Sequence, residues 1–119
     1  MATAVKRKFS QSTNGRGIKV VATATAGTAI HTVVAGTTDG TYDEIWLWAY
    51  NSDTVDRLLT IEFGGTTAPD DHVKVTIQAQ AGWVLVLPGL ILQNGLGVAA
   101  FASAANVVAV QGFINAITD

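Results

Sequence analysis

Short apolar runs separated by turn-forming residues follow one another from Gly17 to the end of the chain. The runs are rich in Val, Ile and Thr, and several alternate apolar with polar residues, a pattern typical of β-strands. No run shows a convincing helical period or helix caps, and the nearest alternative is a helix over the alanine-containing residues 96–105. The pattern therefore predicts eight or nine strands, over residues 18–25, 28–35, 43–52, 57–63, 73–78, 83–87, 90–93, 96–103 and 107–117.

The run Asp43–Ser52 holds two of the three tryptophans and is apolar on both sides of a predicted strand. Its even positions carry Trp46, Trp48 and Tyr50, while its odd positions are aliphatic. One side can pack in a core, but the other needs cover from a loop, an arm or another subunit. Trp83 opens a second doubly apolar run. We assign these four aromatic residues to the core or to self-association.

Glycine and proline indicate where the chain turns. Asn94-Gly95 is the dipeptide that a type I′ turn favours, so residues 96–103 should return antiparallel to residues 90–93. Pro88-Gly89 should bend or bulge its strand, and a second bulge is considered at Gly112.

The run Arg57–Phe63 alternates aliphatic residues with Thr60 and Glu62, which predicts one buried and one wet face. Many short strands without helices predict an all-β fold. We expect an antiparallel β-sandwich, jelly-roll-like or Greek key, and a barrel is the alternative.

Composition narrows the setting of this fold. The 119 residues are 49% hydrophobic and 13% charged, about half the charged share of an ordinary domain, which indicates that much of the surface does not face water. There is no cysteine, so no disulfide or cysteine-ligated zinc is available. No signal peptide is recognisable, and the longest apolar run, residues 81–92, is too short for a membrane helix. We expect a soluble protein that does not use a signal-peptide route.

The basic residues are concentrated near the N-terminus. Five of the seven precede Asp39, the first acid, and four of them are Lys6, Arg7, Lys8 and Arg16. Residues 1–16 lack apolar periodicity, so we expect an extended basic arm before a domain at 17–119. This arm either docks on an acidic neighbour, with nucleic acid less favoured than protein, or is a solvated tail. Its deletion should leave a folded domain.

Candidate chemistry is sparse. His31 has no catalytic partner nearby in the sequence, which favours a half-buried packing residue. Asp70-Asp71-His72 could bind a metal ion, but its spacing matches no zinc or calcium motif, so a solvated turn is preferred. No phosphate loop, nucleophile elbow or obvious carboxylate pair occurs. We therefore expect no enzyme activity, metal or cofactor. The tryptophans could instead form a sugar-stacking platform.

Three segments carry a resemblance to a known family. The run Asp43-Glu44-Ile45-Trp46-Leu47-Trp48-Ala49-Tyr50-Asn51-Ser52, the following Leu58-Leu59-Thr60-Ile61-Glu62-Phe63-Gly64-Gly65 and the corner Val86-Leu87-Pro88-Gly89 resemble small virion proteins of tailed bacteriophages. The resemblance spans residues 28–117. It implies a capsid decoration, or cement, protein that clamps neighbouring capsomers.

The same resemblance implies partners and a location. The implied partners are the major capsid protein and further copies of the chain, with a homotrimer favoured, and neither nucleic acid nor a membrane is expected. The implied location is the capsid exterior, after assembly in the host cytoplasm. Lys6, Arg7, Lys8 and Arg16 would contact the capsid. A tail or fibre module that binds a host glycan, a head-completion or tail-tube protein, and an enzyme whose pocket joins His31 or His72 to a carboxylate remain alternatives.

Overall fold

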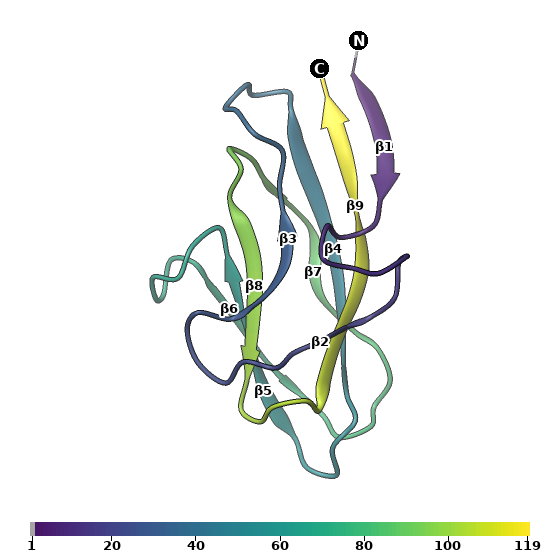
Figure 1. The fold of residues 1–119 in the computed structure, drawn as a ribbon, viewed down its shortest axis with the longest axis vertical. Coiled ribbons are helices and arrows are strands. Elements are labelled where there is room, and N and C mark those ends of the chain that lie inside the picture. The colour runs from purple at the N-terminus through teal and green to yellow at the C-terminus, as the bar shows by residue number, and fades with distance from the viewer. Residues whose placement is uncertain (1) are drawn as a thin grey trace.

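The computed structural model describes residues 2–119, which form nine strands and no helix (Figure 1). The strands are β1 (Thr3–Arg7), β2 (Ile18–Lys19), β3 (Thr28–Thr32), β4 (Tyr42–Asn51), β5 (Arg57–Phe63), β6 (His72–Ile77), β7 (Val84–Leu92), β8 (Gly97–Ala102) and β9 (Val108–Thr118). Within these described residues, no helix is long and apolar enough to span a membrane.

The strands form two antiparallel sheets. Sheet A has five strands in the order β1-β9-β4-β7, with β2 also paired to β9, and sheet B has four in the order β3-β8-β5-β6. From β2 onward the pairs are nested: β2 with β9, β3 with β8, β4 with β7 and β5 with β6. A long hairpin rolled into two sheets produces this order, which is that of a jelly roll. The predicted antiparallel sandwich is confirmed, and β1 is added beside β9.

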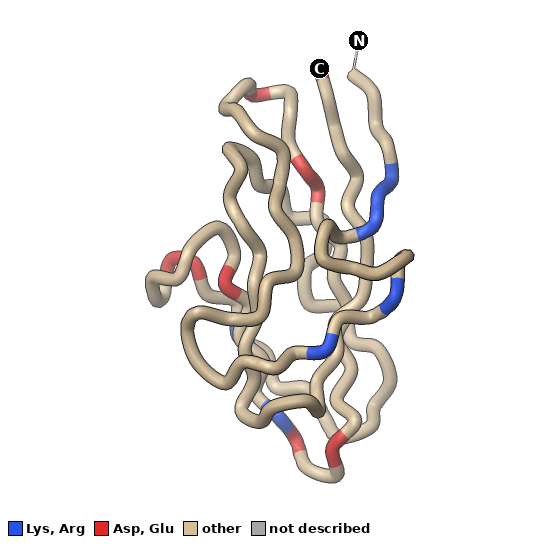
Figure 2. Tube along the Cα trace, viewed as in Figure 1, with Lys and Arg blue, Asp and Glu red and all other residues tan. Residues whose placement is uncertain are grey.

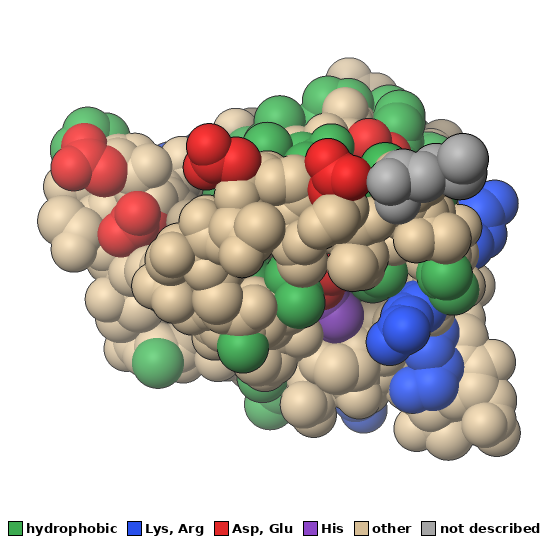
Figure 3. Space-filling view, turned by 90° about the horizontal axis from the view of Figure 1, so that it is seen from above, with side chains coloured by type: hydrophobic (Ala, Val, Ile, Leu, Met, Phe, Trp, Pro, Cys, Tyr) green, Lys and Arg blue, Asp and Glu red, His purple; other side chains and the backbone are tan. Residues whose placement is uncertain are grey.

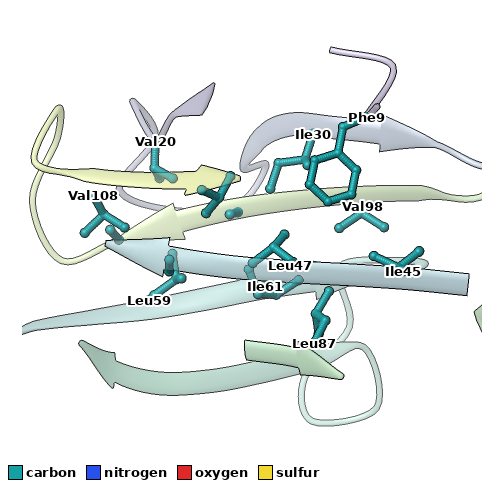
Figure 4. Close-up of a cluster of buried hydrophobic side chains, with 14 of the residues drawn as sticks. Phe9, Val20, Ile30, Ile45, Leu47, Leu59, Ile61, Leu87, Val98 and Val108 are labelled. Atoms are coloured by element: carbon teal, nitrogen blue, oxygen red, sulfur yellow. The ribbon is translucent and has the colours of Figure 1, made fainter. Parts of the chain in front are cut away.

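The core lies between the two sheets (Figure 4). Ile45, Leu47 and Ala49 on β4 have no solvent exposure, and they meet Leu59 and Ile61 of β5 from sheet B in the same cluster. The two sides of β4 alternate as predicted, and the structure shows that the odd positions are the inward ones. The aromatic even positions must lie on the opposite side of sheet A.

The Asn94-Gly95 turn forms, but the expected hairpin does not. Both residues have positive φ angles, 66° and 67°, as a type I′ turn requires. However, β7 pairs with β4 in sheet A, whereas β8 pairs with β3 and β5 in sheet B. The turn instead bonds to the loop after β3, through Gly95 N–H and the carbonyl of Val34 at 2.8 Å. The hairpin prediction was wrong because the turn connects two sheets.

The two expected bulges have different outcomes. Pro88 pairs with Trp46 and Leu90 with Ile45, so Gly89, at φ 81°, is an extra residue and the bulge in β7 is confirmed. In contrast, β9 pairs with β4 in unbroken register across Gly112. A Cβ atom at Gly112 would overlap the backbone oxygen of Trp46, so this glycine serves close strand approach rather than a bulge.

The segment predicted as an extended arm, residues 1–16, is not separate from the sandwich; Met1 lies outside the described residues. The chain is extended in β1 and then turns at residues 10–11 and 14–15. β1 pairs with β9 from Thr3 to Arg7, and all five side chains of the strand are exposed. Phe9 is 1% exposed and belongs to the core. The expectation that this segment contributes no core was therefore wrong, because one aromatic residue in a polar segment shows no periodicity.

The chain's own loop covers part of the outer side of sheet B. Thr60 and Glu62, predicted to form a wet face, are only 1% and 2% exposed. Glu62 accepts hydrogen bonds from the Thr25 hydroxyl at 2.8 Å and from the Gly27 N–H at 2.6 Å. The loop before β3 thus lies over β5, and the predicted wet face is buried.

Candidate interaction surface

The outer face of sheet A is defined by strand register, because directly paired residues point to the same side of a sheet. Three cross-strand rows follow β9, β4 and β7 in turn: Asn115, Glu44 and Ile91; Phe113, Trp46 and Pro88; Gln111, Trp48 and Leu85. Lys6 of β1 extends the first row, and Ala109 with Tyr50 forms a fourth, beside which Trp83 lies. We call these residues the outer face. Lys19 of β2 pairs with Ala109 and so extends the fourth row of the outer face. The acidic and basic residues of the outer face are therefore Lys6, Lys19 and Glu44.

Aromatic rings form the centre of the outer face. The Trp46 ring centroid lies 6.4 Å from that of Trp48 and 6.3 Å from that of Phe113, and the Trp48 and Phe113 centroids are 6.0 Å apart. Tyr50 lies 5.8 Å from Trp83 by the same measure. Trp46, Trp48 and Tyr50 are half-buried by these mutual contacts. Of the two fates expected for the aromatic residues, the structure places them on the outer face and not in the core.

Lys6 and Glu44 lie at the same end of the outer face. Glu44 accepts hydrogen bonds from the indole N–H of Trp46 at 2.7 Å and from the amide of Asn115 at 3.0 Å. These two bonds, the indole bond first, lower the pKa of Glu44. The ammonium group of Lys6 lies 4.5 Å from the centroid of the Phe113 ring. Lys6, expected on a docking arm, therefore belongs to the aromatic face.

The outer face continues to an exposed apolar edge at β7. Trp83 is 48% exposed, Leu85 43% and Ile91 56%. Edge strands of soluble proteins are commonly protected by charged side chains, but residues 75–118 contain no Lys, Arg, Asp or Glu. This uncharged stretch is a sequence signal that the strand patterns did not reveal. The edge is protected only by Pro88 and by two register shifts in the β4–β7 pairing.

A small cleft lies at the end of the outer face that carries Trp48 and Trp83. It has a volume of about 240 Å³ and is lined by Trp48, Trp83, Gln111 and Gly112. Trp83 is thus the tryptophan most open to solvent, and it stands beside an amide side chain. This arrangement resembles a stacking surface for a small planar or ring-shaped group.

Five of the seven basic residues lie along the β1 and β2 edge of the molecule, whereas Arg57 and Lys74 lie on sheet B (Figure 2). Arg7 in β1, and Lys8 and Arg16 in the following loop, have exposed side chains. The acidic residues lie mostly away from this edge. The structure therefore keeps three of the four predicted capsid-contact residues together and assigns Lys6 to the neighbouring outer face.

A larger cleft opens at the end of the sandwich near the termini (Figure 3). Its volume is about 620 Å³, and Arg7, Lys8, His31 and Asp43 are among its lining residues. Nε2 of His31 lies 2.8 Å from a carboxylate oxygen of Asp43, and Nδ1 accepts the N–H of Ser10 at 3.0 Å. His31 is only 7% exposed.

His31 therefore has the carboxylate partner that sequence reasoning missed. Asp43 is twelve residues away in the chain and belongs to the other sheet, so only the packing of the two sheets brings it to His31. The pocket that an enzyme would need is present. However, both ring nitrogens are engaged, and neither is free to take a proton from a substrate. In this arrangement His31 fastens the N-terminal segment to β3 and β4.

The Asp70-Asp71-His72 segment forms a turn and the start of β6. The Asp71 carboxylate accepts the N–H of Thr67 at 3.1 Å, which is the behaviour of a turn-forming residue. The His72 ring packs edge-on against Phe101, and both of its nitrogens are buried without a hydrogen-bond partner. Across residues 2–119, no group of three or more His, Asp or Glu side chains is placed to hold a metal ion.

Comparisons with protein-family models, curated proteins and solved structures return no match. The surfaces described above are therefore the basis for a functional proposal.

Proposed function

We propose that this protein is a structural virion protein: a capsid decoration, or cement, protein that binds the outside of a tailed-phage head and bridges its capsomers. The observation that supports this most is the open outer face of sheet A. The chain's own loop covers part of sheet B, yet the chain leaves an aromatic face and an uncharged edge exposed on sheet A. Antiparallel sheets that face water normally present polar residues, so this face suits permanent burial in an assembly.

The capsid as partner comes from the sequence resemblance, and the charge distribution is compatible with it. Arg7, Lys8 and Arg16 form a basic side that suits an acidic region of the major capsid protein. Each contact can be weak, because a protein that spans several capsomers gains avidity from simultaneous contacts. In this proposal the protein has no catalytic role and needs no cofactor.

Cosedimentation tests this function directly. Expanded shells of the phage that encodes this protein, assembled without it, are mixed with increasing amounts of purified protein and pelleted. We expect saturable binding at a fixed ratio and a higher melting temperature for the decorated shell. Absence of binding at any ratio would refute the decoration role.

Charge reversal tests the contact surface. The variant R7E/K8E/R16E should bind shells at least about tenfold more weakly at moderate salt, since it replaces attraction by repulsion. Lys74→Glu is the matched control for each single reversal, Arg7→Glu, Lys8→Glu or Arg16→Glu, because it makes the same change of charge and Lys74 is exposed on β6 of sheet B, away from the basic side. Equal weakening by the control would show that net charge, and not the basic side, governs binding.

A second function is favoured by one specific observation. The exposed Trp83 beside Trp48 and Gln111 resembles a sugar-stacking site, which suits a tail or fibre module that binds a host glycan. Such a site predicts that surface oligosaccharides of the host protect Trp83 from iodide quenching. Trp83→Phe should retain part of the protection and Trp83→Ala should abolish it. If no oligosaccharide changes the quenching of the wild-type protein, the glycan function is refuted.

A further inference from the structure

We propose that the outer face of sheet A binds the outer face of a neighbouring copy of this chain, in a closed oligomer whose rotation axis runs parallel to the strands. In this oligomer Lys6 of each copy pairs with Glu44 of the next. The inference names the occupant of the surface on which the proposed function rests. It makes no use of a capsid, so the two can fail separately.

The outer face exposes apolar side chains that a partner surface would remove from water. Trp83, Leu85 and Ile91 are 48%, 43% and 56% exposed, and they border the cluster of Trp46, Trp48 and Phe113. Each of these side chains contributes roughly 25 cal/mol per Å² of apolar area removed from water. The register shifts and Pro88 prevent β7 from accepting a further strand in regular pairing. Side-chain packing of face against face is the contact that remains.

The positions of Lys6 and Glu44 support the same inference. Lys6 pairs with Asn115, and Asn115 pairs with Glu44, so Lys6 and Glu44 lie in one cross-strand row. They are two inter-strand spacings apart, roughly 9–10 Å. A rotation about an axis parallel to the strands leaves every residue at its own height along the strands. The row of one copy therefore meets the same row of the next, with Lys6 and Glu44 on facing sides.

The outer face of one copy is complementary to the outer face of another copy. One row of the outer face carries both a cation, Lys6, and an anion, Glu44, and the two rows after it are aromatic, aliphatic or amide. Lys19, in the fourth row, is the remaining charge. A neighbouring copy thus offers Lys6 and Glu44 their opposite charges, and it offers the aromatic rows an aromatic surface. If the two charges lay in different rows, this symmetry would place each of them against uncharged side chains. A closed ring also buries every exposed β7 edge, which prevents open-ended growth.

The test is a charge swap read out as molecular mass. Wild type, Lys6→Glu, Glu44→Lys and the double variant K6E/E44K are compared by light scattering and sedimentation velocity over a range of concentrations, without shells. We expect the wild type to form a small closed oligomer. Each single reversal should raise the dissociation constant at least about tenfold, because like charges then face each other. The double variant should recover most of the lost affinity.

Two controls separate association from folding. Lys74→Glu on sheet B makes the same charge change away from the face and should leave the mass unchanged. Ile91→Lys adds a charge at a 56% exposed position of the same row, so it should dissociate the oligomer while the monomer keeps its β-sheet circular dichroism. This second variant is needed because Glu44→Lys also removes the bond to Trp46.

The outcomes are distinct. A wild-type protein that stays monomeric at all concentrations overturns the inference, even if that monomer binds shells. A double variant as weak as the single variants overturns the Lys6–Glu44 pairing. A closed oligomer with rescue by the double variant that does not bind shells upholds the inference and refutes the decoration function.

Discussion

Phe9 offers the sharpest test of how the N-terminal segment contributes to stability. Its ring is 1% exposed in the core between the sheets and lies 5.9 Å, centroid to centroid, from the ring of His31. Truncation of a buried phenylalanine to alanine typically costs about 3–5 kcal/mol, from lost apolar burial and from the cavity left behind. We expect Phe9→Ala to lower the free energy of unfolding by this amount.

Deleting residues 2–7 provides the comparison. This deletion removes β1, whose five side chains are all exposed, together with its backbone hydrogen bonds to β9. Each such bond contributes about 0.5–1.5 kcal/mol net, whereas each residue released from order recovers about 1–2 kcal/mol of backbone entropy. The two effects nearly cancel. One side-chain truncation should therefore cost more stability than the loss of six residues.

The assay is urea unfolding followed by tryptophan fluorescence, at a concentration low enough for every variant to be monomeric, since association would add apparent stability. A loss of 3–5 kcal/mol is a large part of the roughly 5–15 kcal/mol that holds a domain together. Removal of residues 1–16 should cost at least as much as Phe9→Ala. A Phe9→Ala variant within about 1 kcal/mol of wild type, or a larger loss on deleting residues 2–7, would refute the reasoning.

Three further predictions concern sheet A. Gly112→Ala should lower the free energy of unfolding by about 3 kcal/mol or more, or prevent folding, because the new Cβ overlaps the backbone of β4. Gly97→Ala is the control: its Cβ would have no neighbour nearer than 3.9 Å, so it should be nearly neutral in thermal unfolding. Leu47→Ala, on the buried side of β4, should lower the free energy of unfolding by about 2–5 kcal/mol, measured by urea unfolding. Trp48→Ala, on the outer face, should lose less stability in the same assay but more self-association, measured by light scattering. The pKa of Glu44 is lowered in the folded protein. The ionised carboxylate therefore stabilises the fold fully above the ordinary pKa of 4.5, and this stabilisation is lost as pH falls through the folded-state pKa. The melting temperature of the wild type should consequently fall more steeply in acid than that of Glu44→Gln.

Each of these predictions has an outcome that would count against it. A stable Gly112→Ala protein would mean that β4 and β9 can separate without cost at this position. Equal stability losses for Leu47→Ala and Trp48→Ala would show that the two sides of β4 are equally buried in the monomer. Parallel acid-melting profiles for wild type and Glu44→Gln would show that the hydrogen bonds to Glu44 do not persist in solution.

Local signals in the sequence predicted the elements well. The alternation along Asp43–Ser52 correctly separated its aromatic from its aliphatic positions, and Pro88-Gly89 correctly marked a bulge. Both depend on the period-two geometry of a strand or on the backbone freedom of glycine, which neighbouring residues alone determine. The Asn94-Gly95 dipeptide likewise predicted the turn conformation, but it did not show that the strands on either side of the turn pair with other strands and not with each other.

Pairings between distant residues could not be read from such signals. His31 and Asp43, Thr25 and Glu62, and Phe9 and its core neighbours come together only when the two sheets pack. No spacing rule connects residues from different sheets, because loop lengths and the rolling of the hairpin set their meeting points. This is why a predicted wet face proved to be buried and a predicted arm proved to contribute to the core.

By itself, the sequence determined a low-charge, all-β chain with two runs that are apolar on both sides of a strand. Those properties follow from composition and from the two-residue period of a strand. Only the tertiary structure decided which apolar side stays open. The loop before β3 lies over β5 in sheet B, whereas the aromatic face of sheet A stays open.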